Sequence, residues 1–111
     1  MHIVKLKVNN SIKDKLLECL SREVSCTYRN DFGDNTIIVG EEFRFRISSN
    51  QLYFILFKTT GLELFIDIVC GGGGEGMLNI TWGSEKVFVK RVRNVIVEFC
   101  EKNNEVVEEV Q

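Results

Sequence analysis

The sequence predicts an α+β fold: a curved antiparallel sheet of five to seven strands, with a short N-terminal helix and a long C-terminal helix packed on one face. Three observations predict it. Several short segments have an apolar period of two, two segments place apolar residues at helical spacing, and only short polar or glycine-containing stretches separate consecutive strands. Short connections favour antiparallel pairing, because parallel strands need long crossovers. A chain of 111 residues that is 44% hydrophobic suits a single compact domain.

The first forty residues are expected to alternate between strand and helix. Ser11 and Asp14, three residues apart, resemble a weak capping box, and apolar residues at helical spacing follow them. A cluster of Asn, Asp and Gly then has the composition of a loop. The expected elements are a strand at 2–8, a helix at 11–22, a strand at 24–29, a loop at 30–35 and a strand at 36–39 that breaks at Gly40.

The middle of the chain predicts a run of strands at 42–47, 52–58, 62–70 and 77–82, joined by turns at 48–51 and 59–61 and by a glycine-rich connection at 71–76. The strand at 52–58 is apolar on both faces. One face carries Tyr53, Ile55 and Phe57, and the other carries Leu52, Phe54 and Leu56. The next strand repeats this pattern less fully, with Phe65 and Val69 opposite a face of Leu, Ile and Cys.

The last long segment predicts a helix over residues 84–102. Its apolar residues recur at three and four, Glu85 near the start and Lys102 at the end suit the helix dipole, and Asn103–Asn104 ends it. We therefore expect one domain over residues 1–104, followed by an acidic, frayed tail at 105–111. In outline, this order of elements looks like the helix-grip arrangement, in which a sheet wraps a C-terminal helix; a shared outline carries no function.

Residues 41–100 also resemble a family of small proteins classed only as a domain of unknown function. The residues that carry this resemblance are the two apolar strands, then Gly72, Gly73 and Gly74, and then Thr81-Trp82-Gly83 before the final helix. The first forty residues match less well. The resemblance implies a shared fold and no known activity, and it implies no site residue.

Charge and motifs exclude several classes of function. With 14 basic and 16 acidic residues, the chain lacks the positive surplus of a dedicated nucleic-acid binder. Its four cysteines form no C-x-x-C pair and His2 is the single histidine, so we expect no metal site. No apolar run reaches the length of a membrane span, and no secretory signal is visible, so we expect a cytoplasmic protein with reduced thiols.

The sequence also gives no catalytic residue or cofactor site. Gly71, Gly73 and Gly76 satisfy G-x-G-x-x-G after a strand, but the residues that follow predict another strand and not the helix that a phosphate site requires. Cys70 has no histidine nearby in sequence and shares its parity with core residues. We therefore expect a protein that is not an enzyme, with the glycine run as a mobile loop.

The strongest functional argument concerns apolar area. Two helices can cover one face of a sheet, so something else must cover the second face of the two-sided strands. Self-association ranks first because it needs nothing beyond the chain, and we expect a homo-oligomer, with a dimer as the first choice. The alternative is a carrier that holds a small apolar ligand between the sheet and the C-terminal helix, with the glycine loop as a lid. The candidate residues for an interface or ligand site are Tyr53, Ile55, Phe57, Phe65, Gly72, Gly73, Gly74 and Trp82.

Overall fold

The computed structural model describes residues 2–44, 49–71 and 84–110. Its elements are β1 (His2–Asn9), the 3-10 turn η1 (Asn10–Ile12), α1 (Lys13–Glu23), β2 (Tyr28–Phe32), β3 (Asn35–Arg44), β4 (Ser49–Thr60), β5 (Glu63–Gly71), α3 (Ser84–Lys102) and β6 (Glu108–Val110). The strands form one sheet in the order β2-β3-β4-β5-β1-β6, and every pair in it is antiparallel. The predicted α+β class is confirmed.

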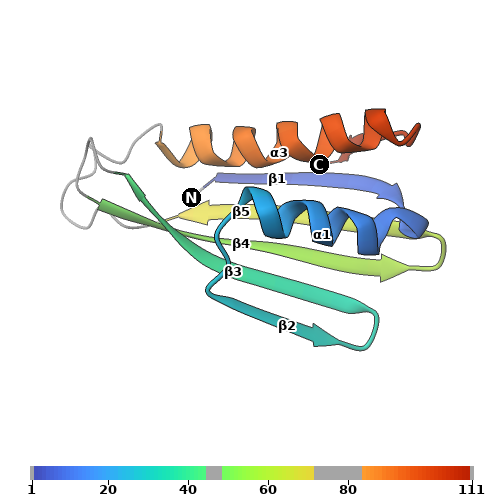
Figure 1. Cartoon of the computed structure of the whole chain (residues 1–111), viewed down its shortest axis with the longest axis horizontal. Helices are drawn as coiled ribbons and strands as arrows, with labels where there is room; N and C mark the ends of the chain where they lie inside the picture. Colours follow the sequence, from blue (N-terminus) through green and yellow to red (C-terminus); the bar gives the residue numbers. More distant parts are fainter. Residues whose placement is uncertain (1, 45–48, 72–83, 111) are drawn as a thin grey trace.

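Both helices lie on the same side of this sheet, so the described chain forms two layers (Figure 1). A single hydrophobic core fills the space between the layers. From the sheet it takes side chains of alternate parity, and from each helix it takes one apolar stripe. Its largest fully buried members are Tyr53, Phe57, Phe88, Leu6, Leu16, Leu20, Ile55, Leu64, Ile66, Ile68 and Ile96.

Two tight turns fix the register of the central hairpins. Gly33 joins β2 to β3 and Gly61 joins β4 to β5, and both have φ of +62°. Each glycine is the first residue of a two-residue loop, since Phe32 pairs with Asn35 and Thr60 pairs with Glu63. A positive φ at that position is the pattern of a type II′ turn, which suits the twist of a hairpin and favours glycine. The turn predicted at 59–61 therefore lies at residues 61–62, and β4 continues to Thr60.

The N-terminal third differs from the prediction in three ways. The strand expected at 24–29 begins only at Tyr28, and the expected loop at 30–35 is instead the hairpin of β2 and β3. The strand expected to break at Gly40 continues through it to Arg44, paired with β4 along its length, and the glycine leaves room for the Tyr53 ring. The expected cap at Ser11 is absent: Asn9 Oδ1 accepts from the Ser11 amide at 2.9 Å and caps the 3-10 turn η1, while α1 follows Ile12 and has no side-chain cap.

The C-terminal part confirms the long helix and corrects the tail. The helix spans Ser84–Lys102 as predicted and ends in a turn at Asn104, whose φ is +59°. The expected frayed tail instead forms β6, which adds to β1 at the edge of the sheet. Glu109 accepts from Arg93 Nε of α3 at 2.9 Å, which ties this short strand to the helix as well. The predicted strand at 77–82 and the glycine connection at 72–76 lie outside the described residues.

Candidate interaction surface

A row of apolar side chains crosses five strands on the face of the sheet that points away from both helices; we call this the outer face. Each residue is opposite the next in the strand register. The row consists of Tyr28, Val39, Phe54, Val69 and Ile3. Successive side chains of a strand point to opposite faces, so these residues alternate with the core residues of the same strands.

Exposure is greatest at the ends of this row. Tyr28 is 55% exposed and Ile3 is 49% exposed, whereas Val39 and Phe54 are half-buried and Val69 is buried at 7% exposure. Leu56 and Ile37 form a second apolar pair beside the row, and Leu52 lies on its other side at 55% exposure. The outer face therefore carries a continuous apolar patch centred on β3, β4 and β5.

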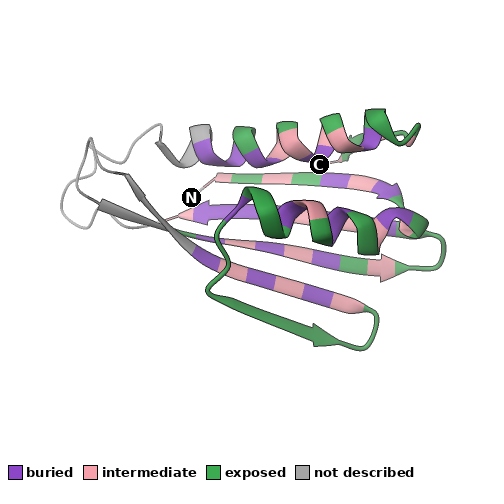
Figure 2. Cartoon of the chain, viewed as in Figure 1, coloured by how far each residue is buried: buried purple, intermediate pink, exposed green. Residues whose placement is uncertain are grey.

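None of the helices in the described part of the chain covers this patch. The buried stripes of α1 and α3 both belong to the core on the opposite face of the sheet. Figure 2 shows the same arrangement, with both helices on one side and alternating buried and half-buried residues along the central strands. A contiguous apolar patch that is partly exposed to solvent marks interaction sites in proteins.

One end of the outer face is charged and internally balanced. Lys7 Nζ lies 3.2 Å from Glu63 Oε2 and 3.3 Å from Glu108 Oε1. Lys58 Nζ lies 3.1 Å from Asp67 Oδ2 on the neighbouring strand. Hydrogen bonds to Glu63 and Glu108 raise the pKa of the Lys7 ammonium, which keeps it charged. The exposed ion pairs add little stability, but they give this end of the face no strong net charge.

The structure separates the residues that the sequence grouped as candidates. Tyr53, Ile55 and Phe57 are fully buried on the helix-covered side, so they belong to the core and cannot form a surface. The physical reason is parity: these three align with the core residues of β5, and the rings of Tyr53 and Phe88 are 4.4 Å apart between centroids. Phe65 does lie on the outer face, half-buried. Gly72, Gly73, Gly74 and Trp82 lie outside the described residues.

Sequence reasoning missed the residues at both ends of the apolar row. Tyr28 falls in the segment expected to be a strand from residue 24, but residues 24–27 are not part of the strand, so that segment gave no register for Tyr28. Ile3 shares its strand face with Lys5 and Lys7, which gives no sign of an apolar surface, yet it pairs with Val69 in the row. The signal in the sequence was the second apolar face of the 52–58 strand. Phe54 on that face lies in the same cross-strand row as Tyr28 and Ile3.

Other chemistry in the described part of the chain is sparse. All four cysteines are present as thiols; Cys70 and Cys100 are buried, and burial raises the pKa of the Cys100 thiol to about 11. No cluster of three or more His, Cys, Asp or Glu side chains that could hold a metal occurs among the described residues. A polar hollow of about 390 Å³ lies beside α1, but its groups bond one another, as where Lys13 Nζ donates to the Asp34 carbonyl at 2.6 Å.

Within the segments that the structure describes, no helix is both long enough and apolar enough to cross a membrane. Comparison of the chain with protein-family models, with curated proteins and with solved structures gave no match. The functional argument therefore uses only the residues of this chain.

Proposed function

We propose that this protein is a non-catalytic association domain whose outer face packs against the outer face of a second copy. The observation that carries the proposal is the apolar row across five strands, which no described helix covers. Two sheets that pack face to face form a sandwich about 10 Å thick, in which apolar side chains of both faces interdigitate. The proposal places the domain in the cytoplasm, and the four thiols support that location.

The size of the outer face supports a second copy as the occupant. The five spacings between six strands, at about 4.8 Å each, give the face a width of about 24 Å. The eight residues of β1, at about 3.4 Å each, give it a length of about 27 Å, so its plan area is about 650 Å². A specific interface buries about 800 Å² on each partner. One face of this sheet is therefore close to the area that a stable pair of copies needs.

Charge supports the same occupant. A face with a large net charge would repel its own copy, whereas the lysines at the margin of this one already pair with carboxylates. A two-fold axis places the same patch on both partners, so apolar rows meet apolar rows and mixed charges meet mixed charges. The outer face meets both conditions.

The test is a charge placed in the middle of the patch. Leu56→Lys puts an ammonium group at a half-buried position opposite Asp67, the carboxylate that Lys58 also contacts, so the single chain can still fold with the new charge beside a carboxylate. In the face-to-face pair the same ammonium group would be buried. We expect it to weaken the association by about 100-fold or more.

A matched control is available. Leu62→Lys makes the same change at a residue that is 82% exposed in the turn between β4 and β5, away from the patch. Light scattering should show an associated mass for the natural chain and for Leu62→Lys, and a lower mass for Leu56→Lys. Equal masses for all three chains would refute the proposal.

The ligand-carrier alternative has less support. Tyr53 of β4 packs directly on Phe88 of α3, and the hollow that remains between β1 and α3, lined by His2, Val4, Lys90 and Arg93, has a volume of only about 190 Å³. Native mass spectrometry decides between the two functions. Extra mass that disappears on denaturation would favour the carrier, and an oligomer of bare chains would favour the association domain.

A further inference from the structure

β2 forms one edge of the sheet and lies beyond the cover of both helices. All five of its residues are exposed, although it pairs along its full length with β3. In Figure 1 it is the outermost strand on the side away from α3. Among the described strands β3 is its only neighbour, so its other edge is open. An open edge presents backbone donors and acceptors to which another strand can pair.

The turn determines which backbone groups point to that open edge. Phe32 and Asn35 flank a two-residue loop, and the residues that flank such a loop exchange both hydrogen bonds. Hydrogen-bonded pairs alternate along an antiparallel ladder. The N–H and C=O groups of Phe32, Asn30 and Tyr28 therefore point to β3, and those of Arg29 and Asp31 point away from it.

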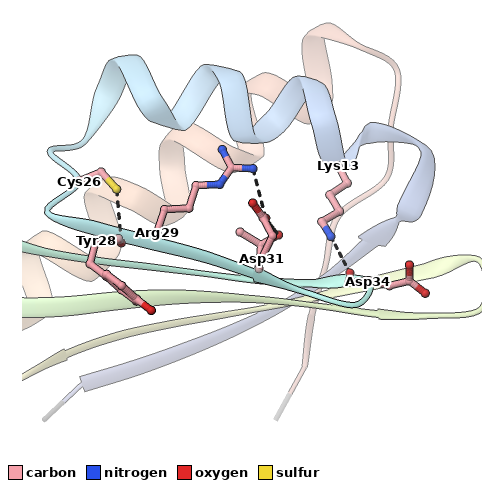
Figure 3. Close-up of polar contacts among 7 residues, drawn as sticks. Lys13, Cys26, Tyr28, Arg29, Asp31 and Asp34 are labelled. Carbon is pink, nitrogen blue, oxygen red and sulfur yellow. Dashed lines mark hydrogen bonds and ion pairs between the residues drawn. The ribbon is translucent and has the colours of Figure 1, made fainter.

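The side chains of β2 are complementary to those of an identical strand that runs antiparallel to it. The strand reads aromatic, basic, Asn, acidic, aromatic over Tyr28–Phe32. Arg29 and Asp31 lie on the face of the sheet that carries the helices, and Tyr28 lies on the outer face (Figure 3). Within one chain Arg29 Nη2 already lies 3.3 Å from Asp31 Oδ1, and Thr36 Oγ1 donates to the same oxygen at 2.6 Å.

We propose that β2 pairs antiparallel with β2 of a second copy, about a two-fold axis through Asn30. In this register Arg29 lies opposite Asp31 of the other copy, twice over, and Tyr28 lies opposite its Phe32. Opposite charges and aromatic pairs in directly opposed positions both stabilise a sheet. The register also brings together the backbone groups of Arg29 and Asp31 that point outward, so they form the hydrogen-bonded pairs of the new ladder.

This edge pairing would produce one continuous sheet from two copies. Residues of equal parity meet across the new ladder, so the outer faces of both copies stay on the same side. Tyr28 and Phe32 then lie inside the enlarged apolar surface instead of at its margin. The edge pairing is thus a second interface, independent of the face-to-face packing proposed above.

The test exchanges the charges of β2 in chains that also carry Leu56→Lys, so that packing of the outer faces does not contribute to the association. Arg29→Asp gives a chain with two acidic residues on β2, and Asp31→Arg gives one with two basic residues. Like charges directly opposite each other destabilise a sheet, so each chain alone should have the mass of a monomer. An equimolar mixture should form a pair, since every Asp then faces an Arg. The parent chain should also be paired at high micromolar concentration.

A mixture that stays monomeric, or a parent chain that stays at 12.8 kDa, would overturn the edge pairing. Neither result bears on the outer face, which the Leu56→Lys and Leu62→Lys comparison tests separately. Asp31→Arg also removes the acceptor of Thr36, so circular dichroism should first establish that this chain is folded.

A second measurement does not depend on these variants. In the Leu56→Lys chain, hydrogen exchange resolved by residue should show the Arg29 and Asp31 amides becoming protected as the concentration rises. The Asn30 amide, which points to β3, should be protected at every concentration. Concentration-independent exchange at Arg29 and Asp31 would exclude the proposed register.

Discussion

Gly40 is the position at which a single methyl group tests the packing of the core most sharply. A Cβ added there would lie 2.5 Å from Tyr53 Oη, 2.6 Å from Tyr53 Cζ and 2.6 Å from the carbonyl oxygen of Ser25. Real Cβ atoms do not approach neighbours so closely, so either the ring or the backbone must move. Tyr53 is fully buried against Phe88, which limits the movement of the ring.

Overpacking of this kind costs typically 1–3 kcal/mol, and we expect about 2 kcal/mol for Gly40→Ala. At about 2.1 cal/mol/K per residue, the unfolding entropy of 111 residues is about 0.23 kcal/mol/K, so Tm should fall by about 9 °C. Thermal unfolding followed by circular dichroism measures this shift. A Tm within about 2 °C of the natural chain would refute the close approach of Gly40 to Tyr53.

A double-mutant cycle separates the two contacts. Tyr53→Phe removes the hydroxyl that comes closest to the added methyl group, and it also removes the hydrogen bond of about 3.3 Å between Tyr53 Oη and Ser25 Oγ. The cost of Gly40→Ala should therefore be smaller in the Tyr53→Phe chain by about 1 kcal/mol. The contacts with the ring carbon Cζ at position 53 and with the Ser25 carbonyl remain in both backgrounds, so part of the cost persists. Strict additivity would contradict the geometry.

Three further predictions concern single groups. Thr36→Val removes the hydrogen bond that is the largest cause of the lowered pKa of Asp31, so a carbon-detected NMR titration should show a higher pKa for this carboxyl group. As the pH falls through the carboxylate range, the variant should therefore lose less stability than the natural chain does. Burial raises the pKa of Cys100 from about 9 to about 11, so the thiol of the unfolded chain ionises at lower pH than that of the folded chain. The free energy of unfolding measured in urea should therefore fall as the pH rises from about 9 to about 11, and Cys100→Val should abolish this pH dependence. Leu20→Ala should cost about 2–5 kcal/mol in urea unfolding because the side chain is fully buried between α1 and the sheet, and a cost below about 1 kcal/mol would contradict that position.

Local periodicity was enough to predict the long helix and the central hairpin strands. Ser84–Lys102 has the bounds that its apolar spacing indicates, because a buried stripe on a long helix leaves a strong pattern in the sequence. β2 left no such pattern. It is an edge strand with neither face buried, so its polar residues have the composition of a loop. β6 was missed for a related reason: three residues pair with β1 from the far end of the chain, and nothing local marks them.

The alternation of residues along a strand was not enough to predict which face of β4 is exposed. The strand now assigned as β4 has three large apolar residues on each face, so its own sequence is symmetric between them. The choice of side depends on register with β5, where Ile55 lies opposite Ile68 and Phe57 opposite Ile66 in the covered layer. Gly40 adds to it, because only a residue without a side chain leaves room for Tyr53 beneath β3. Both constraints are non-local, so the sequence predicts a two-sided strand without indicating which side the helices cover.

The most direct test of the face-to-face packing is an isotope-filtered NOE experiment on an equal mixture of labelled and unlabelled chains. Contacts between the two kinds of chain arise only across an interface. We predict cross-peaks that join Phe54, Leu56 and Val69 of one copy to the outer face of the other, with none from the Leu62 turn. A chain that remains at 12.8 kDa, or cross-peaks confined to residues outside the outer face, would contradict the packing.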